Sequence, residues 1–186
     1  MSSAKRHRWL LFLSQVPGAS STARVTLWRH LRASGAISPT QGAWVLPAGE
    51  RQRRAFGEIA RVAREQGGSA AVFDAAAIEG VSDDELIERF RAERGREYTE
   101  FHTKADDFLA EIAKETRAGK FMFAELEEIE DDLLKLTAWL AKIRDRDFFP
   151  HDDLTKAEDH LRRCELEHQR FAAQVYEHEK LNDPNS

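Results

Sequence analysis

Arginine is the residue type with the clearest chemical potential in this sequence. Two clusters lie near the start of the chain: Arg24, Arg29, Arg32, Arg51, Arg53 and Arg54. A guanidinium keeps its charge and offers a fork of N–H donors that matches phosphate and other oxyanions. We expect these side chains to bind a nucleic-acid backbone with strong salt dependence and little sequence preference. A solvated face with ordinary ion pairs, or a surface that docks onto acidic helices, is the alternative.

Arg24 occupies an unusual position in its own segment. In SSTARVTLWRHLR, at about 100° per residue, Arg24 falls inside an apolar stripe formed by Ala23, Leu27, Trp28 and Leu31. A buried guanidinium would need a partner, for which Asp74 is the candidate. Alternatively, the side chain passes Trp28 to reach solvent, or it joins helix N-terminal amides in binding phosphate or another oxyanion.

Other chemistry-bearing residues favour structural roles. His160, Cys164 and His168 share one helical face but span about 12 Å, too far for one metal site, so we expect packing and no metal. Trp28 and Trp44 are expected in the core rather than stacked on bases. No catalytic fingerprint or cofactor motif is present in the sequence, which predicts a non-enzymatic protein without a cofactor.

Charge divides the chain into unlike halves. Residues 1–80 hold 11 Lys and Arg against 5 Asp and Glu, a net of +6, whereas residues 81–186 hold 17 against 28, a net of −11. We therefore expect a basic α/β domain over 1–80 and an acidic, coiled-coil-like helical extension over 81–186. A polyanion partner for the basic half, or docking between the halves, would follow.

The first 80 residues alternate between strand and helix periodicity. We expect strands at 8–16, 42–47 and 69–78, a further short strand near 36–38, and helices at 20–34 and 50–66. This order matches the ferredoxin-like split βαβ arrangement, and the fold class is α+β. A winged helix is the rival, although such domains begin with helices.

Residues 82–180 have helical spacing throughout. Ser82 and Glu85 form a capping box, and apolar residues between Leu126 and Ile143 step by three and four. After Asp147–Pro150, Asp152 or Asp153 can cap another helix with the same spacing. The pattern predicts a long antiparallel helical hairpin, with the helix from Ser82 as a third member.

Composition favours a soluble, cytoplasmic protein. The 186 residues are 41% hydrophobic, enough for a core, and the single cysteine excludes an intramolecular disulfide. The apolar run at residues 9–13 is too short for a membrane span and lacks a signal-peptide cleavage pattern.

Several motifs occur in the order of a known family. RWLLFLSQVPGASSTARVTLWRHLRASGA, then GAWVLP and later RDRDFFP, resemble the N-terminal region of ChrB, the regulator associated with bacterial chromate-resistance operons. The match covers nearly the whole chain. The first quarter also resembles the S-x-x-R-V-x-x-W-R-x-L-R pattern of PaaX-type repressors.

The ChrB resemblance implies a DNA-associated, chromate-responsive regulator of transcription. Longer ChrB proteins carry a further C-terminal region with Cys- and His-containing segments, whereas this sequence ends at Ser186. We therefore expect a separate partner of the ChrB C-terminal type or, through self-association of the helical hairpin, a homodimer. A protein-interaction module whose helical arm docks another chain, without DNA contact, is the alternative function.

Overall fold

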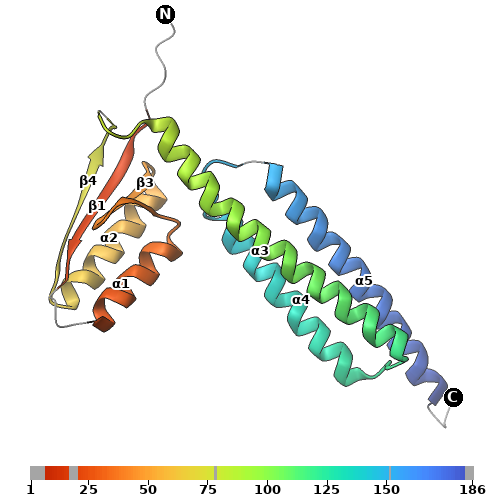
Figure 1. The fold of residues 1–186 in the computed structure, drawn as a ribbon. Helices are drawn as coiled ribbons and strands as arrows, with labels where there is room; N and C mark the ends of the chain where they lie inside the picture. Colours follow the sequence, from red (N-terminus) through yellow and green to blue (C-terminus); the bar gives the residue numbers. More distant parts are fainter. Residues whose placement is uncertain (1–6, 17–20, 78, 151, 183–186) are drawn as a thin grey trace, which may run out of the picture. The chain divides into compact units, whose positions relative to one another are not determined.

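The chain forms two compact units, residues 1–91 and 92–186. The computed structural model describes residues 7–16, 21–77, 79–150 and 152–182 (Figure 1). Its elements follow in this order: β1 (Trp9–Gln15), α1 (Ser21–Ala33), β2 (Ile37–Thr40), β3 (Ala43–Pro47), α2 (Glu50–Glu65), β4 (Ser69–Ala75), α3 (Asp83–Ala118), α4 (Phe123–Arg144) and α5 (Asp152–Asn182). The first turns of α3 belong to the N-terminal unit.

The N-terminal unit has the predicted ferredoxin-like arrangement. Its sheet has the order β2-β3-β1-β4, and each neighbouring pair is antiparallel. The two crossover helices, α1 and α2, lie on one face of this sheet (Figure 1). A winged helix is excluded, because β1 is central and precedes both helices.

Alternation along β1 builds two layers of packing. Leu10 and Phe12 are fully buried on the helical side, where the Phe12 ring centroid lies 5.2 Å from that of Phe56 on α2. Trp9 points to the opposite face, stacks on Phe90 of α3 at 5.9 Å and donates its Nε1–H to Asp83 at 2.7 Å. The start of α3 therefore covers part of the sheet's second face.

The C-terminal unit is a helical bundle with the expected seams. The buried positions of α4 are Leu126, Ile129, Leu136, Leu140 and Ile143. Those of α5 include Ala157, Cys164, Phe171 and Val175, and α3 contributes Phe101, Ala105, Phe108 and Ile112 to the same core. α4 and α5 run antiparallel, as Figure 1 shows, and the step of three and four places the apolar stripe of each helix inward.

Helix ends follow local chemistry. The Oγ of Ser82 accepts the backbone N–H of Glu85 at 3.1 Å, as a serine N-cap does, whereas the Glu85 carboxylate pairs with Arg89 at 2.6 Å and does not complete the predicted capping box. α3 ends where Gly119 adopts a φ of +65°, a conformation that costs glycine little. Strand β4 ends at Ala75, earlier than expected. Ser20 and Ile78, at the ends of two predicted elements, lie outside the described residues.

The described helices are all too short or too polar to cross a lipid bilayer.

Candidate nucleic-acid interface

The burial pattern of α1 turns its arginines outward. Ala23, Leu27 and Leu31 are buried and hold the helix on the sheet. Arg24 and Arg29 are exposed, and Arg32 is half-buried. The hypothesis of a buried Arg24 is therefore wrong, and the alternative in which its side chain reaches solvent agrees with the structure. The apolar stripe is narrow, and Arg24 lies at its margin.

Asp74 pairs with other arginines of the N-terminal unit. Arg8 binds it through two bonds, Nε to Oδ1 at 3.1 Å and Nη2 to Oδ2 at 2.5 Å. Arg53 of α2 reaches the same carboxylate at 3.7 Å and also lies 3.9 Å from Glu50. Arg53, one of the six predicted arginines, thus shares its charge with two carboxylates in the same unit.

α2 adds three arginines to the exposed side of the helical layer. Phe56, Ile59, Ala60 and Ala63 are its buried residues. Arg51, Arg54 and Arg64 are exposed. Sequence reasoning missed Arg64. A signal that could have identified it is that no acidic residue lies three or four positions away, where a helical ion pair would form.

Arg61 provides an internal contrast on α2. It binds Glu58 at 3.0 Å and Glu65 at 2.5 Å, and the hydrogen bonds to these carboxylates raise its pKa. In the described part of the chain, Arg29, Arg54 and Arg64 have no such acidic partner. We use the term arginine face for the surface formed by Arg24, Arg29, Arg32, Arg51, Arg54 and Arg64.

Trp28 lies on the arginine face and is 53% exposed, so the prediction that it packs in the core is wrong. The guanidinium carbon of Arg32 lies 5.9 Å from its ring centroid, a cation–π contact. Trp44 is half-buried and shares with Arg24, Trp28 and Ser14 the lining of a small pocket of about 190 Å³. An exposed indole beside arginines can stack on a base or a sugar.

A buried ionic cluster organises the start of the C-terminal unit. Glu97 of α3 lies 3.2 Å from Arg94, which is 4% exposed, and 3.1 Å from Arg146, beyond the end of α4. Tyr98 donates a hydrogen bond from its hydroxyl to Asp147 at 2.9 Å. Burial is the larger cause, and this hydrogen bond the smaller one, that raises the pKa of Tyr98. These contacts fasten the RDRDFFP segment to α3.

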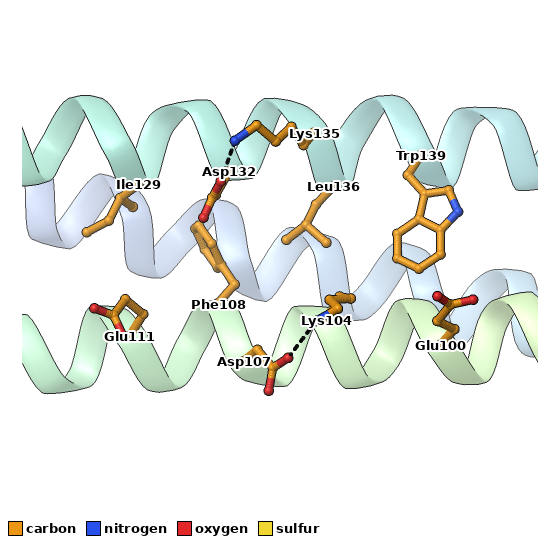
Figure 2. Close-up of a pocket in the computed structure, with 10 residues that line it drawn as sticks. All are labelled: Glu100, Lys104, Asp107, Phe108, Glu111, Ile129, Asp132, Lys135, Leu136 and Trp139. Atoms are coloured by element: carbon orange, nitrogen blue, oxygen red, sulfur yellow. Dashed lines mark hydrogen bonds and ion pairs between the residues drawn. The ribbon is translucent and has the colours of Figure 1, made fainter.

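A groove of about 600 Å³ runs between α3 and α4. Figure 2 shows its apolar side chains Phe108, Ile129, Leu136 and Trp139 between charged rims. On the rims, Lys104 pairs with Asp107 at 3.2 Å and Lys135 with Asp132 at 2.7 Å, while Glu100 and Glu111 add negative charge. An amphipathic helix with basic flanks fits this chemistry.

Two histidines join α3 to α5. The Nδ1 atoms of His102 and His160 are 2.9 Å apart, and Asp106 Oδ1 lies 3.3 Å from Nε2 of His160. One Nδ1 must donate while the other accepts, so the contact requires at least one neutral imidazole. Sequence reasoning placed His160 on one helical face with Cys164 and His168 but missed His102, because its partner is 58 residues away.

Acidification is expected to weaken this helical junction. Burial chiefly, and then His160, lower the pKa of His102, with Lys156 acting in the same direction and Asp106 and Asp153 opposing. As the pH falls below about 6.5, the His102 imidazole of the unfolded chain binds a proton before that of the folded chain does. The free energy of unfolding therefore falls until the pH passes the lower pKa that His102 has in the folded state. Between pH 7.5 and pH 5, the urea midpoint of unfolding should fall more for the natural sequence than for His102→Gln. Equal losses in both would contradict the prediction.

Cys164 has a packing role, as expected. Cys164 is fully buried with its Sγ 3.8 Å from the carbonyl oxygen of Ala105, and burial raises the pKa of its thiol to about 11. A thiol with this pKa holds little reactive thiolate at neutral pH. Within the described ranges, no three His, Cys, Asp or Glu side chains converge as metal ligands would.

Together, the fold and the site define a class: a ferredoxin-like unit with an arginine-bearing helical layer, followed by a three-helix unit. The chain belongs to the family described as Protein ChrB, N-terminal, whose model matches residues 24–182. This result confirms the resemblance carried by the sequence motifs.

A curated relative gives the same family. Protein ChrB of Cupriavidus metallidurans is 26% identical over 160 residues, which cover 85% of this chain and 45% of the relative. The chain thus spans less than half the length of that relative. No solved structure matches the chain with significance.

Proposed function

We propose that this chain is a non-enzymatic, DNA-associated regulator of a chromate-resistance operon, acting in the cytoplasm. The observation that carries the proposal is the arginine face, in which arginines of α1 and α2 project from one helical layer. Membership of the ChrB N-terminal family supports a role in chromate resistance. Chromate is the oxyanion to which the regulator would respond.

The chemistry of the arginine face favours the phosphate backbone. Guanidinium groups neutralise phosphates and release counterions, so affinity falls steeply as salt is added. Trp28 adds an aromatic surface between the arginines, and the bound duplex would be positioned mainly by its backbone. Arg53 contributes less, because Asp74 and Glu50 share its charge.

Fluorescence anisotropy tests the proposal directly. The protein is titrated into labelled duplex from its own upstream promoter and into a scrambled duplex, at 50 and 200 mM salt, with and without chromate. We expect tighter binding to the promoter, a steep loss of affinity with salt and weaker binding with chromate. No binding to either duplex at 50 mM salt would overturn DNA association, and indifference to chromate would overturn the sensing role alone.

The groove between α3 and α4 favours a second candidate function, an interaction module. Its partner would be an amphipathic helix with basic flanks, supplied by a separate chain of the ChrB C-terminal type. Glu100 on α3 would meet a basic flank, while the half-buried Trp139 of α4 would contact the apolar side. This function predicts no DNA binding in the anisotropy experiment.

A further inference from the structure

The two edges of the N-terminal sheet are protected very differently. The edge strand β2 has four residues, includes Pro39 and shifts register between Ile37 and Thr40. The carbonyl oxygen of Pro39 also accepts a hydrogen bond from Arg89 Nη1 at 3.0 Å. Short length, proline and irregular register are the features that stop an edge strand from pairing with another chain.

Strand β4, at the opposite edge, has none of these protections. Its seven residues, SAAVFDA, pair with β1 in continuous register from Ser69 to Ala75. Asp74 is its one charged side chain, and Arg8 and Arg53 already balance that charge. Within the described ranges, no strand pairs with its outer edge. Such a regular, nearly uncharged edge can accept a further strand.

The face of β4 that turns away from α1 and α2 is apolar and exposed. Val72 lies opposite Phe12 and shares its helical side, so Ala71 and Phe73 point to the other face. Phe73 is 49% exposed, Ala71 is exposed, and Leu13, opposite Ala71 on β1, is 39% exposed. Val72 is therefore flanked by a small apolar side chain, Ala71, and a large one, Phe73.

We propose that β4 pairs, antiparallel and centred on Val72, with β4 of a second copy of this chain. In this register all seven residues of β4 pair with the second copy, because Val72 is the midpoint of Ser69–Ala75. It sets Phe73 of each copy opposite Ala71 of the other, next to Leu13, so that large and small side chains fill each other's space. Asp74 then meets Ala70 and no like charge.

The dimer has a geometric consequence for the arginine face. A two-fold axis perpendicular to the joined sheet leaves the helical layers of both copies on the same side. The two arginine faces would then contact one duplex at two symmetric half-sites. This consequence rests on the proposed function, whereas the pairing of β4 does not.

Sedimentation velocity over a range of protein concentrations, without DNA, tests the pairing. The natural sequence is expected to form dimers as concentration rises. Phe73→Lys and Ala71→Glu should each raise the dimer dissociation constant at least about tenfold, since each substitution acts at two symmetric places. An equimolar mixture of the two variants should recover dimers, because Lys at 73 of one copy then faces Glu at 71 of the other.

A matched control separates this interface from the helical unit. Leu134 on α4 is 60% exposed, and Leu134→Lys should leave self-association unchanged. A monomer at all concentrations, or dimers lost in Leu134→Lys and kept in Phe73→Lys, would overturn the pairing of β4. Failure of the mixture to recover dimers would overturn the register centred on Val72. Because no DNA is present, none of these results depends on the proposed function.

Discussion

Removing the charges of Arg29 and Arg54 together is expected to weaken binding to duplex DNA about 10- to 100-fold at physiological salt. The two residues lie on different helices of one layer and are exposed. In the described part of the chain neither has an acidic partner, so their donors are available to phosphates. The variant is Arg29→Gln combined with Arg54→Gln, which removes the charge and keeps a polar, unbranched side chain.

The salt dependence gives the sharper readout for this variant. Each lost phosphate contact should make the slope of log affinity against log salt shallower by about 0.9. Arg61→Gln is the matched control, because Arg61 lies on α2 but is already bound by Glu58 and Glu65. We expect its affinity and slope to stay near those of the natural sequence. An equal loss in the control would assign the effect to overall charge and contradict a specific arginine face.

Glu97→Ala is expected to destabilise the C-terminal unit by about 3 kcal/mol. Its carboxylate is shared by Arg94, which is 4% exposed, and Arg146. Removing it breaks two ion pairs at once and takes a carboxylate away from a buried guanidinium. Urea unfolding followed by circular dichroism at 222 nm measures the loss, with the transition of this helix-rich unit fitted separately.

Two further variants test the cause of that loss. Asp132→Asn removes one partner of an exposed pair with Lys135 and should leave the urea midpoint unchanged. Glu97→Ala combined with Arg94→Met removes the buried charge together with its partner and should recover much of the stability. If the double variant is as unstable as Glu97→Ala, loss of packing and not an uncompensated charge explains the effect.

Much of the fold could be predicted from local patterns. The strand and helix order, the serine cap at Ser82 and the seams of α4 and α5 agree with the structure. These features depend on residues a few positions apart, whose periodicity alone says which face of an element is apolar. The ends of elements were less predictable, as at β4, because fraying depends on neighbouring strands.

The candidate site could be predicted only in part. Residue type and spacing identified Arg24, Arg29, Arg51 and Arg54, which are exposed, although they missed Arg64. The same reasoning placed Trp28 in the core, since a tryptophan beside a narrow apolar stripe can pack inward or lie on its margin. How wide a stripe the sheet can cover is a property of the assembled layers and not of one helix.

Local patterns in the sequence are enough to predict the α+β class, the ferredoxin-like order of elements, the helical seams and the segregation of basic from acidic residues. The pairing of Asp74 with Arg8 and Arg53, the contact between His102 and His160, and the contrast between the open edge at β4 and the protected edge at β2 become visible only in the folded chain. The difference arises from sequence separation. Periodicity fixes the face on which a side chain lies, but its partner on another element depends on strand register and helix packing, which are set by the whole core.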